Sequence, residues 1–145
     1  MIEFDEIELR NEFINTIREG FAEYYDLLGA EVQVESEEPQ EATFPCCIAK
    51  LVNPISDQKY DNSSGSYQII RFSLECDLYS NRIADYTATD SITKLSQLLI
   101  KIIISKYPTF VVTRNSQVPF RVDIKRRVVD FACTYDIKNK IIYSN

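Results

Sequence analysis

The sequence has no histidine and only three glycines, and both shortages limit the chemistry that it can support. Without histidine, Ser-His and Cys-His nucleophiles are excluded, and acid–base catalysis would fall to carboxylates, lysine or tyrosine. Gly20, Gly29 and Gly65 belong to neither of the glycine-rich patterns that cradle nucleotide phosphates. We therefore expect a protein that is not an enzyme and that binds no cofactor.

The four cysteines do not form a metal-binding pattern, because none of them lies in a CxxC pair. Without histidine either, no zinc site is expected. Adjacent Cys46 and Cys47 would point to opposite faces of a strand, whereas Cys76 and Cys133 lie in stretches where apolar residues alternate with polar ones. We expect four buried, reduced thiols, as in a cytoplasmic protein.

Long apolar runs are also absent, since Lys101 interrupts the longest one, LLIKIII. A membrane span needs about 20 apolar residues, so none is expected. We also find no charged-then-apolar leader and expect a protein that is not exported. A length of 145 residues corresponds to one domain over residues 1–145.

Charge is divided unevenly along the chain. Residues 1–45 carry 13 acidic and 2 basic side chains, whereas residues 46–145 carry 9 acidic and 14 basic ones. One interpretation is an acidic, solvated helix beside a mildly basic sheet. The other is that the two oppositely charged parts meet between subunits.

The most regular stretch runs over residues 67–106. Apolar Ile70, Phe72, Leu74, Cys76 and Leu78 alternate with polar residues, which predicts a strand with one buried and one solvated face. A helix should follow, with a stripe through Ala88, Ile92, Leu95, Leu99 and Ile102. Because Leu98, Ile100, Ile103 and Ile104 widen this stripe, a second helix or a second subunit should cover the remainder.

The other elements surround this strand and helix. We expect a first helix over residues 6–28, with a stripe from Ile7 to Leu28, and strands over residues 32–35, 46–52, 109–114, 125–137 and 141–144. Residues 115–119 should form a loop, and the long polar segment 53–66 should order only against a partner. The order α-β-β-β-α-β-β(-β) predicts an α+β fold, with a mainly antiparallel β-sheet and two helices packed on one face. Its core should contain Phe72, Leu74, Cys76, Leu95, Leu99, Ile102, Phe131 and Cys133.

Two small groups of charged residues were weighed as binding sites. Glu75 and Asp77 would project from the same face of the strand and could bind a divalent ion, but a polar solvent or subunit face is favoured. Lys125, Arg126 and Arg127 form a basic run that could bind DNA. A net charge of −6 argues against DNA binding, because such domains are usually basic.

Three stretches resemble a known family. They are FPCCIAKL (residues 44–51), FSLECDLYSNR (residues 72–82) with the helix after it, and VVTRNSQVPFRVDIKRRVVDFACTYDIKNKIIY (residues 111–143). Together they resemble the tail terminator, or tail completion, proteins of tailed bacteriophages and prophages. The resemblance implies a virion protein, assembled in the host cytoplasm, that forms a ring, typically a hexamer. Such a ring caps the tail tube, joins it to the head connector and leaves a lumen through which DNA passes as cargo.

The partners implied are therefore other copies of the chain, the tail tube protein and the head connector or stopper protein, with no membrane. By the same analogy, the loops at residues 36–45 and 53–66 face the tube or the connector. If ring contacts are head-to-tail, the acidic first helix or residues 35–41 should face a neighbour's basic run, and the wide helix should supply apolar contact. The candidate interface residues are Arg71, Glu75, Asp77, Tyr79, Arg114, Lys125, Arg126 and Arg127.

Two alternatives stay open. Another neck, head-completion or tube-joining protein of the virion could share this architecture, and it would differ in which ring surface binds which partner. An unrelated enzyme or a small cytoplasmic binding module is the other class of alternative, and gene neighbourhood would separate it from a virion protein.

Overall fold

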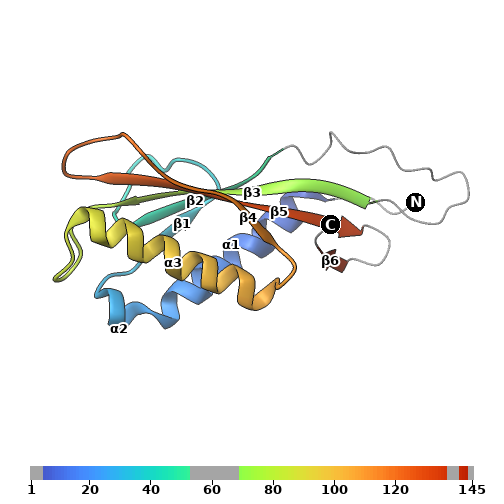
Figure 1. Cartoon of the computed structure of the whole chain (residues 1–145), viewed down its shortest axis with the longest axis horizontal. Helices are drawn as coiled ribbons and strands as arrows, with labels where there is room; N and C mark the ends of the chain where they lie inside the picture. Colours follow the sequence, from blue (N-terminus) through green and yellow to red (C-terminus); the bar gives the residue numbers. More distant parts are fainter. Residues whose placement is uncertain (1–4, 53–68, 137–140, 144–145) are drawn as a thin grey trace, which may run out of the picture.

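The computed structural model describes residues 5–52, 69–136 and 141–143. Figure 1 shows a single sheet with the helices packed against one side of it. The strand order is β1-β2-β3-β5-β4, and β6 pairs with β5. Of these pairs, β1–β2 is parallel and the others are antiparallel. The predicted α+β class, the mainly antiparallel sheet and the helices on one face are therefore confirmed.

The elements follow the predicted order, with one short helix added after the first. They are α1 (Glu6–Glu23), α2 (Tyr25–Leu28), β1 (Gln33–Glu35), β2 (Cys46–Val52), β3 (Ile69–Ser80), α3 (Ala88–Lys106), β4 (Val111–Val118), β5 (Lys125–Asp136) and β6 (Ile141–Tyr143).

The central strand β3 has the predicted alternation, and its neighbours continue it. Leu74 lies opposite Leu51 of β2 and Phe131 of β5, so one apolar row crosses the sheet on the side that faces the helices. The eight residues predicted to share the core are all buried in one cluster. The predicted strand register is therefore correct, as expected when one face of a sheet must be buried.

Helix α1 begins where the sequence predicts but buries a different stripe. Asp5 caps it by accepting a hydrogen bond from the Glu8 N–H at 2.9 Å. The buried residues include Leu9, Phe13 and Ile17, whereas the predicted Ile7 is 61% exposed. The prediction was wrong at Ile7, because this residue lies at the border of the buried stripe, where the helix no longer faces the sheet.

The first helix was also predicted to be continuous to Leu28, and it is not. The α1 helix ends at Glu23, and the one-turn helix α2 follows from Tyr25. Gly29 closes α2 with a left-handed backbone (φ 69°), the conformation that favours glycine at a helix C-terminus.

Helix α3 begins after Thr87, whose hydroxyl accepts a hydrogen bond from the Asp90 N–H at 3.2 Å. Its wide apolar stripe is covered within the chain, since α1 packs beside it over the same side of the sheet (Figure 1). Leu98 and Ile103 are buried in the core cluster, and Ile100 and Ile104 are half-buried against it. Of the two predicted partners for the apolar stripe of α3, a second helix or a second subunit, the structure shows the second helix.

Gly20 is the point of closest approach between α1 and α3. A Cβ atom there would lie 2.5 Å from Cγ2 and 2.7 Å from Cγ1 of Ile102, closer than van der Waals contact allows. Alanine would gain about 1 kcal/mol of helix propensity, but overpacking costs about 1–3 kcal/mol. We expect Gly20→Ala to lower the free energy of unfolding by up to about 2 kcal/mol in urea denaturation. In an Ile102→Ala background the same change should cost nothing, and an equal loss in both backgrounds would contradict this account of the contact.

Strand β4 differs from its prediction in both bounds. A strand over residues 109–114 and a loop over residues 115–119 were expected, but β4 runs over Val111–Val118 with an irregularity between Val112 and Arg114. Its polar residues 115–117 pair with β5 from Val129 to Arg127. Pairing with a strong neighbouring strand therefore outweighs the loop-like local composition.

Some predictions lie outside the described residues. These are the partner-dependent loop at residues 53–66 and the last residue of the strand predicted over 125–137. Within the described residues, the helices are too short or too polar to span a membrane.

Candidate functional site

The sheet face turned away from the helices is the most distinctive surface of the chain, and we call it the open face. Register places Glu75 of β3 opposite Lys50 of β2 and Asp130 of β5. Arg114 of β4 lies opposite Asp130 on the same face. Charged side chains of both signs thus cross four neighbouring strands, and in Figure 1 no helix covers them.

This face is only partly solvated, which corrects the prediction of a wet face. Arg71 is exposed, but Asp77 is 7% exposed and Tyr79 is half-buried. The crossover segment of residues 36–45 connects the parallel strands β1 and β2, and Figure 1 shows it and the β4–β5 connection running over this side of the sheet. Cys46, Ile48 and Val128 are buried on the same face.

Asp77 and Arg126 form the ion pair at the centre of the covered part. Both carboxylate oxygens of Asp77 lie 3.1 Å from Nη2 of Arg126. The hydrogen bond to Asp77 raises the pKa of Arg126 further above its ordinary value. Because Asp77 is buried, removing either partner would leave a charge without compensation, which costs far more than an exposed pair contributes.

An aromatic contact joins this ion pair to the β4–β5 connection. The Arg126 guanidinium lies 5.7 Å from the centre of the Tyr79 ring, and Tyr79 meets Phe120 edge-to-face at 5.1 Å. Burial, followed by the charge of Asp77, raises the pKa of Tyr79. The connection is therefore held down on the open face by a cation–π contact and a ring contact.

The tip of the β4–β5 connection projects from this support. The Arg121 N–H donates to the Ile124 carbonyl at 3.2 Å, and Ile124 is buried. Val122 lies between them and is 91% exposed. An apolar side chain held out on an anchored turn is available for contact with another molecule.

Asp130 lies on the open face and its carboxylate is incompletely hydrogen-bonded. Burial raises its pKa, and the charge of Arg114 opposes that shift. Its Oδ1 is buried and has no hydrogen-bond partner among the described residues, which is also true of Nε of Arg126. A buried polar atom without a partner is costly, so this part of the face is not optimised for stability.

The structure places six of the eight candidate interface residues on the open face. Strand β3 contributes four of them, β4 one and β5 one: Arg71, Glu75, Asp77, Tyr79, Arg114 and Arg126. Asp77 is bonded to Arg126, so the pair of Glu75 and Asp77 is not a free carboxylate pair. In the described ranges, no group of three or more acidic or cysteine residues could hold a metal ion.

Lys125 and Arg127 lie on the other side of the sheet from Arg126. They pair with Ser80 and Leu78, which belong to the helix-facing row of β3. Nε of Arg127 donates to Oδ1 of Asn115 on β4 at 2.6 Å. The basic run is thus divided by strand alternation and does not form one patch.

Lys50, Phe120 and Asp130 contribute to the open face and were not among the candidates. The position of Asp130 opposite Glu75 and Arg114 depends on the pairing of three strands. Phe120 follows the loop predicted over residues 115–119 and was assigned to no element. The residues next to Asp130 and Phe120 in the sequence do not indicate that either one belongs to the open face.

The four cysteines are buried free thiols, as predicted. Burial, with the neighbouring Cys47, raises the pKa of Cys46 to about 12. Burial also raises the pKa of Cys133. Since the thiolate is the reactive form, these groups are poor nucleophiles and poor metal ligands in the folded chain.

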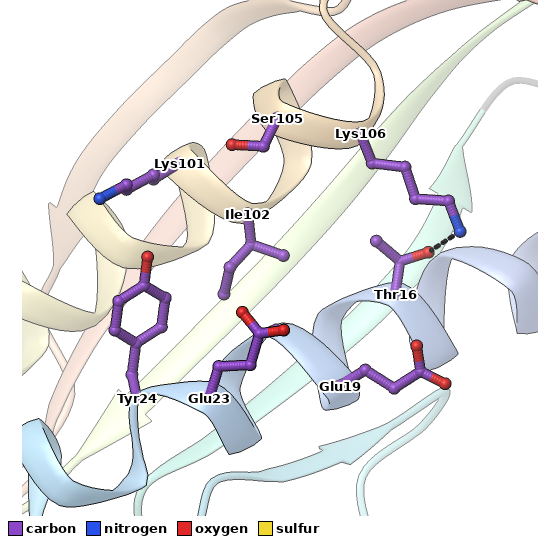
Figure 2. A pocket seen from close by; sticks show the side chains of 9 residues that line it. Thr16, Glu19, Glu23, Tyr24, Lys101, Ile102, Ser105 and Lys106 are labelled. Atoms are coloured by element: carbon purple, nitrogen blue, oxygen red, sulfur yellow. Dashed lines mark hydrogen bonds between the residues drawn. The ribbon is translucent and has the colours of Figure 1, made fainter.

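A second candidate site is the groove of about 390 Å³ between α1 and α3 (Figure 2). Lys106 lies at one end and donates to Oγ1 of Thr16 at 3.1 Å, while Lys101 and Tyr24 lie at the other end. The floor is Ile102 against Gly20, the helix contact described above. Both signs of charge line the walls, and these polar groups support the packing of the two helices.

The open face thus combines charged side chains, aromatic rings and an anchored turn. It offers ion pairs, an anchored turn and a row of charged side chains, without an activated nucleophile or a metal-binding group among the described residues. We compared the chain with models of protein families and with curated protein sequences, and neither comparison gave a match.

Proposed function

We propose that this chain is a structural virion protein of a tailed bacteriophage or prophage. In this role, copies of the chain form a ring that terminates the tail tube and joins it to the head connector. The proposal takes the ring, the partners and the location from the sequence resemblance.

One observation carries the proposal. The stretches that resemble tail terminator proteins are separated along the chain, yet they include four neighbouring strands of the sheet, β2, β3, β5 and β4. These four strands carry the open face and its ion pair. The resemblance therefore includes all four strands that carry the open face, which supports an assembly role better than a likeness confined to one strand would.

Charge is compatible with DNA passing through such a ring. The net charge of −6 means that a ring of this chain would neutralise few phosphates. DNA affinity depends strongly on the number of neutralised phosphates, so the ring would hold DNA weakly. Weak holding suits a channel through which DNA moves as cargo.

Deletion of the gene in the phage or prophage that carries it tests this role. If the protein caps the completed tube and joins it to the head, its loss should give filled heads without tails and tubes of irregular length. Electron microscopy of the particles after induction shows both features, and the gene supplied from a plasmid is the control.

The alternatives predict different particles. A head-completion or other neck protein would leave tails of normal length, with heads that fail to hold DNA or to bind a tail. Normal, infectious particles in the deletion strain would contradict every virion role and favour a small cytoplasmic binding module.

A further inference from the structure

We propose that copies of this chain associate head-to-tail through the two opposite edges of the sheet, the acidic edge at β1 meeting the basic edge at β4 of the next copy. This inference rests on the proposed function, since it names the contact between subunits of the ring. It replaces the earlier expectation that the wide α3 helix supplies that contact, because α1 covers α3 within the chain.

The acidic edge consists of residues 31–41, which include β1 and the start of the crossover segment. This stretch carries five acidic side chains and no basic one. Four of them are exposed, and the fifth, Glu35, is half-buried. Several like charges on one edge repel each other, and an oppositely charged partner would relieve that repulsion.

The basic edge consists of β4, the turn after it and the start of β5, residues 111–127. This stretch carries five basic side chains and one acidic one. Arg114 is exposed on the open-face side of β4, and Arg127 lies against Asn115 on its helix-facing side. Positive charge therefore borders both sides of this outer strand.

The topology keeps the two edges apart. Strands β2, β3 and β5 separate β1 from β4 in the sheet, which corresponds to about 19 Å at the usual strand spacing. For the two outer strands themselves this distance exceeds the Debye length of about 8 Å at physiological salt, so charges on β1 and β4 do not neutralise each other within one chain. Glu38 of the crossover segment lies nearer, since its charge acts on Tyr79 beside Arg126. A second copy can bring the two edges into contact.

Charge also selects the direction of association. A two-fold contact through β4 would set Arg114 and Arg127 against the same residues of the partner, and a two-fold contact through β1 would set acidic groups against acidic groups. A contact between opposite edges avoids both repulsions. Such a heterologous contact continues from copy to copy and closes into a ring when the rotation allows it.

The backbone of the two edges supports the same pairing. At β1, Nη2 of Arg18 already donates to the Val34 carbonyl at 2.8 Å, so this backbone acceptor is occupied. A neighbouring copy would therefore contact the side chains of β1 and not its backbone. At β4, no strand of the described residues pairs with the outer side. The acidic segment of the neighbouring copy, residues 35–41, would cover this outer strand, as exposed edges are commonly covered in native proteins.

Two double variants test the contact. The first is Arg114→Glu with Arg127→Glu, which removes the net positive charge of the basic edge and places two acidic side chains on it. The second is Glu37→Lys with Glu41→Lys, which places two basic side chains on the acidic edge and leaves it with little net charge. Arg126 is left unchanged because it is bonded to the buried Asp77. As a control, Glu19→Lys with Lys101→Glu exchanges charges in the helix groove of Figure 2, away from both edges.

Each edge variant alone should associate at least about 10-fold more weakly than the wild type in sedimentation velocity, since the changed edge loses its charge complementarity and the substituted side chains face like charges. An equal mixture of the two should recover assemblies of wild-type size, because every second contact in an alternating assembly is native and the others bring the new lysines of one variant against the new glutamates of the other. Native mass spectrometry should find the two variants in equal number in those assemblies. The control should assemble as the wild type does.

The outcomes separate this inference from the proposed function. The edge contact is wrong if the wild type assembles and either folded edge variant assembles equally well. It is also wrong if the mixture of the two folded variants forms no assemblies of wild-type size. In both cases the proposed ring is not contradicted. If the wild type stays monomeric, both the contact and the ring are contradicted. Circular dichroism establishes that the variants fold. If the variant with two glutamates does not fold, Arg114→Gln with Arg127→Gln replaces it. This milder variant should weaken association by a smaller factor. Unchanged association would overturn the edge contact.

Discussion

Phe13→Ala should lower the free energy of unfolding by about 3–5 kcal/mol, measured by urea denaturation. The side chain is fully buried between the helix layer and the sheet. Its ring lies 5.2 Å from that of Tyr107, 5.7 Å from that of Phe110 and 6.0 Å from that of Phe72. Alanine would leave a cavity at the point where α1, α3 and β3 meet, and three aromatic contacts would be lost.

Ile7→Ala is the matched control on the same helix. Because Ile7 is mostly exposed, its truncation should change stability by no more than about 0.5 kcal/mol. The comparison distinguishes the observed stripe of α1 from the predicted one. Equal losses at the two positions would mean that α1 is rotated relative to the orientation described here.

Asp77→Ala should have the second large effect, a loss of about 2–4 kcal/mol in the free energy of unfolding. It would leave the half-buried Arg126 without its partner and weaken the support for Tyr79 and Phe120. Replacing both residues, as Asp77→Leu with Arg126→Leu, should recover most of that loss, because no charge is then buried alone.

Glu75→Ala provides the control for Asp77. It lies two residues away on the same face, is half-buried and is not a member of the ion pair between Asp77 and Arg126. Its loss should cost about 0.5 kcal/mol or less. If Glu75→Ala and Asp77→Ala destabilise equally, the ion pair with Arg126 is not the source of the effect.

The sequence was sufficient for the parts of the fold in which one periodicity dominates. Strand β3 has five alternating apolar residues, and α3 has an apolar stripe at helical spacing, so both were predicted closely in extent and in buried face. In α1, several apolar residues lie around the helix, and a seven-residue spacing from Ile7 drifts by about 20° per repeat relative to a straight helix. The centre of the true stripe at Phe13 could not be chosen without the neighbouring elements.

Gly20 shows a different limit of sequence reasoning. In isolation it reads as a weak position in a helix, because glycine lowers helix propensity. In the structure it is the contact point for Ile102 of α3. Its role depends on a residue 82 positions away in the chain, whose proximity follows from the packing of the two helices.

The candidate site was predicted unevenly for a similar reason. Alternation predicted which residues of β3 lie on its polar side. The same alternation divides Lys125, Arg126 and Arg127 between two faces, but because the three are adjacent they were treated as one basic run. The strand order could not be read locally, and it is the order that sets the acidic and basic stretches at opposite edges. A division of charge along the chain thus becomes a division of charge across the sheet.

The most direct test of a ring is the mass of the wild-type chain in solution, measured by sedimentation equilibrium over a range of protein and salt concentrations. We predict one closed species several times heavier than the 16.8 kDa chain, about 101 kDa if the ring has six subunits. Rising salt should shift it toward the monomer, since opposite charges meet at its contacts. A 16.8 kDa monomer at every concentration would contradict the ring.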